Sequence, residues 1–185
     1  MKSKREDSES SFFGYNGDMR LFIAVLPDEE AVKELITMQN ELYSQGIRGR
    51  YLSEENLHLT MTFIGEYPDP DTILDLMEEV PFEPYEIRIT SPYCHNNIWR
   101  AGVECPEEAE KYVKALRHQL ADHSVPFSPQ KFVPHITLVR GAKGTLRDSI
   151  AGNDVSMTVK AVCLMRSDRG KTGMNYTEIG RVEVV

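Results

Sequence analysis

The stretch NLHLTMTFIGE, residues 56–66, limits most tightly how this chain can fold locally. In an extended strand successive side chains point to opposite faces, so its apolar and polar residues separate. One face carries Leu57, Leu59, Met61 and Phe63. The other face carries His58, Thr60 and Thr62. The alternation predicts a strand whose apolar face packs in the core while its polar face presents an imidazole and hydroxyls.

A second stretch, FVPHITLVR at residues 132–140, repeats this arrangement. Ile136 and Leu138 share one face, and the same alternation places His135, Thr137 and Val139 on the other. Two H-x-T triplets with apolar second and fourth residues are expected by chance on the order of once in a thousand such chains. The repetition therefore needs an explanation that a single triplet would not.

A lone histidine on a strand is more often a buried structural residue than a catalyst. Two histidines in matched patterns favour catalysis, because two imidazoles flanking one phosphate supply a base and an acid near neutral pH. Neighbouring hydroxyls can donate to phosphoryl oxygens as charge develops. We predict that His58 and His135 form a catalytic pair.

The charge of the chain limits its partners. A formal net charge of −8 argues against a long nucleic-acid footprint, which needs many cationic contacts. A few inward-facing arginines could still hold one phosphoryl group, so an RNA partner would be engaged at an end.

The lengths of the apolar runs and the spacing of the cysteines indicate the compartment and the need for a metal or cofactor. The longest apolar runs, such as LFIAVL at 21–26, are too short to span a bilayer, and MKSKREDSES at the start lacks an apolar segment. We expect a cytoplasmic protein without a membrane partner. The three cysteines have no C-x-x-C spacing, so we expect reduced thiols, no metal site and no cofactor.

The order of the predicted elements indicates the fold class. We expect helices at 28–46, 69–80 and 106–124. We expect strands at 19–27, 56–65, 83–94, 96–105, 131–141, 155–167 and 174–185. Strands and helices do not alternate steadily, which favours an α+β fold with largely antiparallel sheets. Residues 1–18 are predicted to be a flexible leader before a single domain at 19–185.

The two motifs resemble a known family. HLTM at 58–61 and HITL at 135–138 match the paired H-x-T-x motifs of the 2H phosphoesterases, in the branch of RNA 2',3'-cyclic phosphodiesterases, or 2'-5' RNA ligase-like proteins. RLFIAVLP at 20–27, IWRAGVE at 98–104 and the closing LMRS are similar to that branch in order and spacing. The resemblance implies two pseudo-symmetric lobes, one motif from each lobe in a central cleft, and no metal.

The resemblance also implies roles. His58 corresponds to the proton donor and His135 to the proton acceptor, with Thr60 and Thr137 binding the phosphate. Arg140 matches a basic residue of similar proteins, although an arginine at a strand end can also simply face solvent.

Several other residues have more than one possible role. Phe63 matches an aromatic that stacks a terminal base, but alternation favours packing unless the strand bulges. Trp99 is expected to pack. The segment SDRGKTGMNY departs from the family, and Tyr176, Arg169 or Lys171 could take the place of the family's usual tyrosine.

Three functions are compatible with the sequence. The first is metal-independent hydrolysis of RNA 2',3'-cyclic phosphate ends to 2'-phosphates. The second is 2'-5' RNA joining, or cleavage of another cyclic or oligonucleotide phosphodiester. The third is non-catalytic binding of RNA ends or nucleotides. The expected partners are RNA 3' ends or small cyclic nucleotides, and we expect a monomer.

Overall fold

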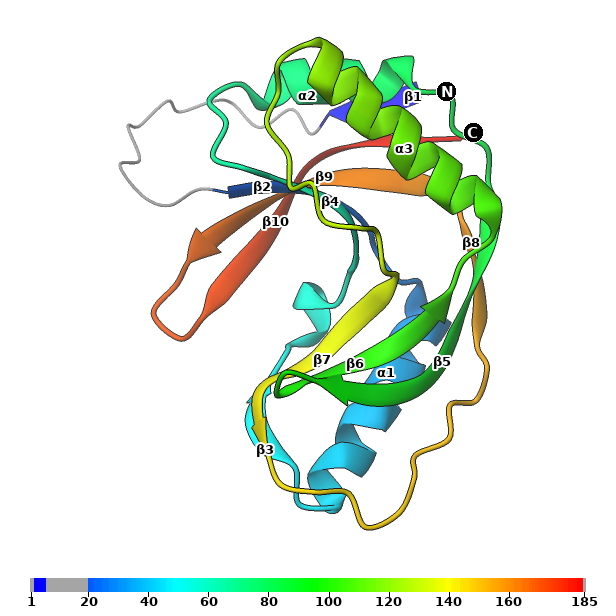
Figure 1. Cartoon of the computed structure of the whole chain (residues 1–185), viewed down its shortest axis with the longest axis vertical. Helices are drawn as coiled ribbons and strands as arrows, with labels where there is room; N and C mark the ends of the chain where they lie inside the picture. The colour runs from blue at the N-terminus through cyan, green and yellow to red at the C-terminus, as the bar shows by residue number, and fades with distance from the viewer. Residues whose placement is uncertain (1, 6–19, 185) are drawn as a thin grey trace.

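A computed structural model describes residues 2–5 and 20–184 of the chain (Figure 1). The helices are α1 (Glu29–Ser44), η1 (Glu54–Asn56), α2 (Pro70–Glu79) and α3 (Glu107–Asp122). The strands are β1 (Lys2–Arg5), β2 (Arg20–Val25), β3 (Arg48–Tyr51), β4 (Leu59–Gly65), β5 (Tyr85–His95), β6 (Ile98–Glu104), β7 (His135–Lys143), β8 (Ser156–Val159), β9 (Ala161–Arg169) and β10 (Met174–Glu183). Most of the leader predicted at 1–18 lies outside the described residues, and residues 2–5 form β1.

The strands form one curled sheet in the order β1-β10-β9-β2-β4-β7-β6-β5-β8, with β3 paired to β7 as a branch. Every described pairing is antiparallel, from the β1–β10 pair to the β6–β7 pair. The two halves meet between β4 and β7, where a single residue pair, Leu59 with Ile136, joins them. The predicted α+β fold with antiparallel sheets is confirmed.

The helices divide between the two halves of the sheet. Helices α2 and α3 lie together and pack on the half that contains β4, β9 and β10, whereas α1 packs on β7 and β8 (Figure 1). Helices α1, α2 and α3 start where the sequence predicted, whereas the short helix η1 was not predicted. Asp28 caps α1 by accepting a hydrogen bond from the Ala31 N–H at 2.9 Å, and Pro106 takes the N-cap of α3. No helix of residues 2–5 and 20–184 is long and apolar enough to cross a membrane.

The structure corrects two strand assignments. Residues 155–167 were predicted to form one strand, but they form β8, which pairs with β5, and β9, which pairs with β2 and β10. Strand β3 was not predicted, because RGRY has no apolar alternation. It pairs with β7 and leaves its arginines exposed.

Candidate active site

The junction between the two halves brings the motifs together. Leu59 lies opposite Ile136 in an antiparallel pair. Extending that register by one residue in each direction sets His58 opposite Thr137 and Thr60 opposite His135. Each histidine therefore lies beside the other motif's threonine, and all four side chains point to the same face of the sheet.

Each motif ends in a one-residue bulge at its fourth position. In β4, Thr60 pairs with Ala24 and Thr62 pairs with Ile23, so Met61 is extra. In β7, Thr137 pairs with Arg100 and Val139 pairs with Trp99, so Leu138 is extra. An extra residue shifts the alternation by one, so the strand faces exchange beyond it.

The bulges overturn three sequence-based face assignments. Thr62 was predicted to share a face with His58, but it is 1% exposed and accepts a hydrogen bond from Arg117 of α3 at 3.2 Å. Val139 was predicted to lie beside His135, but it is fully buried. Phe63 was predicted to pack in the core, but it is 52% exposed.

The residue five positions after each histidine consequently turns to the cleft. In the first motif this residue is Phe63, whose ring lies 6.0 Å from that of Phe22. Phe22 in turn lies 4.9 Å from the His58 ring, which places both aromatic rings on the histidine's side of the sheet. In the second motif the equivalent residue is Arg140, whose charge acts on both histidines.

Both imidazoles are held in the same way. The Nδ1 of His58 lies 2.8 Å from the carbonyl oxygen of Asn56, and the Nδ1 of His135 lies 2.8 Å from the carbonyl oxygen of Val133. A carbonyl only accepts, so each Nδ1 carries the proton and donates it. The Nε2 atom of each ring is therefore left to exchange a proton with a ligand.

The environment favours neutral imidazoles in the free protein. The pKa of His58 is lowered to about 4, mainly by burial; the hydrogen bond to Asn56 opposes this shift, and the charges of Arg140 and His135 contribute to it. Burial also lowers the pKa of His135, and Arg100 and Arg140 act in the same direction. Because the charge of Arg140 acts on both imidazoles, Arg140 lies close to both histidines.

Arg100 is a site residue that the sequence reasoning missed. It pairs with Thr137, so its side chain lies on the cleft face. Its Nε–H is buried without a hydrogen-bond partner among the described residues. Buried donors are normally satisfied, so this one is available to an anionic ligand. An arginine inside the otherwise apolar run IWRAGV was a signal, but only the β6–β7 register shows where it points.

Tyr176 is the one of three candidates from the turn segment that reaches the site. Its ring meets the His58 ring edge-on at 5.0 Å and the Phe22 ring at 5.3 Å. Arg169 and Lys171 lie in or beside the exposed β9–β10 turn. Trp99 is 9% exposed and belongs to the main core, which confirms that it packs.

Asn56 connects the site to β10. Its side chain donates to the Met174 carbonyl oxygen at 3.1 Å and accepts from the Tyr176 N–H at 3.3 Å. Its own carbonyl oxygen accepts the hydrogen bond from the Nδ1–H of His58. One residue therefore orients the first imidazole and fixes the strand that carries Tyr176.

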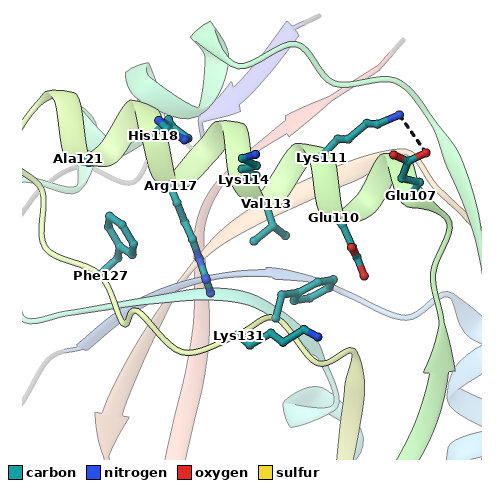
Figure 2. A pocket seen from close by; sticks show the side chains of 11 residues that line it. Glu107, Glu110, Lys111, Val113, Lys114, Arg117, His118, Ala121, Phe127 and Lys131 are labelled. Carbon is teal, nitrogen blue, oxygen red and sulfur yellow. Dashed lines mark ion pairs between the residues drawn. The ribbon is translucent and has the colours of Figure 1, made fainter.

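Two cavities among the described residues bear on the location of the site. A cavity of about 280 Å³ lies beside the histidines and is lined by residues that include Arg50, Arg140, Asn56 and Tyr176. A larger cavity of about 650 Å³ lies under α3, away from the face that carries the histidines. Figure 2 shows Arg117 and Val113 pointing from α3 toward the segment with Phe127 and Lys131. Within the part of the chain that the structure describes, no three His, Cys, Asp or Glu residues are grouped to hold a metal ion.

Comparisons with known proteins agree with this geometry. The family model of the 2'-5' RNA ligase superfamily matches residues 26–171. The chain belongs to this superfamily. The resemblance predicted from the two motifs is thus confirmed.

Relatives within the superfamily cover most of the chain. An RNA 2',3'-cyclic phosphodiesterase of Thermotoga maritima is 32% identical over 136 residues, which are 66% of this chain and 70% of the relative. One from Escherichia coli (strain K12) is 27% identical over 168 residues, 88% of this chain and 94% of the relative. Among solved structures, E. coli LigT complexed with 3'-AMP has a TM-score of 0.76 at 22% identity, covering 91% of this chain and 99% of that chain. This last likeness shows that the two proteins share the fold.

Proposed function

We propose that this protein hydrolyses 2',3'-cyclic phosphate ends of RNA to 2'-phosphates, using two histidines and no metal ion. The observation that carries the proposal is the Leu59–Ile136 register, which sets two H-x-T motifs side by side on one face. The names of the Thermotoga maritima and E. coli relatives support the choice of substrate.

The reaction would proceed by in-line attack. A water oxygen forms a bond to phosphorus while the bond from phosphorus to the 3'-oxygen breaks. The Nε2 of His135 takes a proton from the water, and the Nε2 of His58 gives a proton to the leaving 3'-oxygen. The products are a 2'-phosphate and a free 3'-hydroxyl. The acid and base roles follow the family resemblance.

Four side chains would stabilise the phosphoryl oxygens. Thr60 and Thr137 offer hydroxyl donors beside the histidines, and Arg100 and Arg140 supply positive charge. Donors already in place where negative charge develops need no rearrangement during the reaction. The buried Nε–H of Arg100 would gain in the complex the partner that it otherwise lacks.

The protonation states bear on the assignment of roles. In the free protein the low pKa of His58 favours the neutral form, which a base needs. A bound phosphate anion raises the pKa of nearby imidazoles, so an acid can be recruited as substrate binds. Because the resemblance makes His58 the acid, we propose that it gains its proton together with the substrate.

The test of the function is product analysis. An RNA oligonucleotide ending in a 2',3'-cyclic phosphate is incubated with excess chelator, and the products are separated by chromatography against 2'- and 3'-phosphate standards. We expect the 2'-phosphate alone. His58→Ala and His135→Ala should each lower the rate by roughly 10²–10⁴-fold, whereas His118→Gln, at an exposed position of α3, serves as the matched control. Metal-reversible loss of activity with chelator would instead indicate a metallo-phosphodiesterase.

The roles are separated by a second substrate, in which sulfur replaces the bridging 3'-oxygen. A thiolate leaves without a proton, so loss of the acid should matter much less than loss of the base. Rescue of His58→Ala alone supports the proposed roles. Rescue of His135→Ala alone would reverse them.

The superfamily's description also names 2'-5' RNA joining. Hydrolysis and joining need the same acid, base and phosphate ligands, so the site is compatible with both. An incubation of the cyclic-phosphate RNA with an excess of a second RNA carrying a 5'-hydroxyl tests this. A longer product with a 2'-5' bond would favour joining.

A further inference from the structure

Two arginines face each other beside the histidine pair. Strand β3 pairs with β7 so that Arg50 lies directly opposite Arg140. Like charges at opposed positions of neighbouring strands are unfavourable. The structure records no ion pair for either guanidinium among the residues that it describes. An anion between the two would relieve the repulsion.

The same two arginines line the cavity of about 280 Å³. Glu55 is the one acid in its lining, and its carboxylate is engaged by its own backbone N–H and by Ser53, contacts that lower its pKa. The β9–β10 turn forms another wall. A Cβ placed on Gly173 would lie 3.9 Å from the Cδ and Nη1 atoms of Arg50, so the turn approaches this guanidinium closely.

The cavity adjoins the histidine pair through two shared residues, Arg140 and Tyr176. Arg140 lines it and also acts electrostatically on His58 and His135. Tyr176 lines it as well, and its ring contacts the His58 ring at 5.0 Å. At about 280 Å³ the cavity is smaller than the roughly 300–1,000 Å³ of sites that enclose drug-sized ligands. It suits one phosphodiester with its sugar.

We propose that the Arg50–Arg140 pair binds the phosphate on the 5' side of the reacting nucleotide, so that the protein prefers RNA oligonucleotides to 2',3'-cyclic mononucleotides. This inference rests on the proposed function, because the reacting cyclic phosphate is placed at the histidines. Arg140 contacts both the cyclic phosphate at the histidines and the 5'-side phosphate, whereas Arg50 contacts only the 5'-side phosphate.

The test compares three substrates: a 2',3'-cyclic mononucleotide with a 5'-hydroxyl, the same nucleotide with a 5'-phosphate, and a dinucleotide ending in the cyclic phosphate. We expect kcat/KM to be higher for the two substrates that carry the 5'-side phosphate. Arg50→Ala should reduce this preference by roughly tenfold or more, since it removes a charge-assisted contact. Arg50→Lys, which keeps the charge, should retain part of it.

The matched control is Arg48→Ala, two residues away on the same strand. The Arg48 guanidinium donates to the Tyr43 carbonyl oxygen at 2.8 Å and stacks over the Tyr43 ring at 4.2 Å, so it is directed away from the cavity. The variant removes the same charge and should keep the preference of the unmodified protein. Equal kcat/KM values for the three substrates, or equal losses in Arg48→Ala and Arg50→Ala, would overturn the proposal and leave the hydrolytic function standing.

A binding measurement separates this proposal from the function itself. Calorimetry compares a dinucleotide ending in a 2'-phosphate with the corresponding mononucleotide that has a 5'-hydroxyl. Tighter binding of the dinucleotide that is lost in Arg50→Ala supports the subsite even in a protein that hydrolyses none of the substrates. Equal binding of the two ligands contradicts it.

Discussion

Replacing His58 with asparagine should remove a pH dependence of stability that the buried imidazole imposes. Burial lowers the pKa of His58 from 6.5 to about 4 in the folded protein, whereas the unfolded chain keeps the ordinary value. Between these values the unfolded chain binds a proton that the folded protein does not, so stability falls as the pH drops through this window. The full shift corresponds to about 3 kcal/mol, and about 2 kcal/mol of it is lost between pH 7 and pH 4.5.

The assay is urea unfolding of the full chain at several pH values from 7 to 4.5, with and without the substitution. Asparagine changes the stability at every pH, but the diagnostic quantity is the slope. Carboxyls with lowered pKa, such as those of Glu55 and Asp69, lose stability on acidification in both proteins and cancel in the difference. His118→Gln, at an exposed position, should keep the slope of the unmodified protein. Parallel curves for the unmodified protein and His58→Asn, within about 0.5 kcal/mol, would refute the reasoning.

Asn56→Ala removes two side-chain hydrogen bonds to β10 and should lower the free energy of unfolding by about 1–3 kcal/mol in urea, whereas exposed Asn40→Ala should change it by less than about 0.5 kcal/mol. A cost for Asn56→Ala as small as for Asn40→Ala would show that these bonds do not hold the strand. Phe63→Ala should raise KM for RNA ending in a cyclic phosphate by about tenfold or more through lost base stacking, and an unchanged KM would return Phe63 to a packing role. Binding of inorganic phosphate at pH 7 should be accompanied by proton uptake on the histidines, because the phosphate charge raises the pKa of both imidazoles. Calorimetry in two buffers of different ionisation enthalpy measures this uptake, and identical heats would contradict it.

The sequence was sufficient to predict the elements whose signals are local. Helix α1 begins after its capping Asp28 and ends before Gly46, and α3 begins directly after Pro106. The paired motifs were also visible, because period-two alternation holds up to the threonine of each. His58, Thr60, His135 and Thr137 therefore fall where the alternation places them.

The features that the sequence did not reveal depend on pairing between strands that are far apart in the chain. The bulges at Met61 and Leu138 become apparent only when β4 is aligned with β2 and β7 with β6. No residue type in HLTM or HITL marks an extra residue, so simple alternation misplaced Phe63. Arg100 was missed for the same reason, since its contact with the site depends on a strand pairing across more than thirty residues.

Each bulge adds one residue between a histidine and the side chain that faces the cleft beyond the threonine. Deleting Met61 or Leu138 would leave Thr62 opposite Ile23 or Val139 opposite Trp99, so Phe63 or Arg140 would stay on the cleft face. These side chains would turn to the helix-covered side only if the extra residue stayed in the chain and paired regularly. The cleft face therefore accepts one residue fewer without a bulge, or the present length with one, and the β9–β10 turn can vary in length without rotating either histidine.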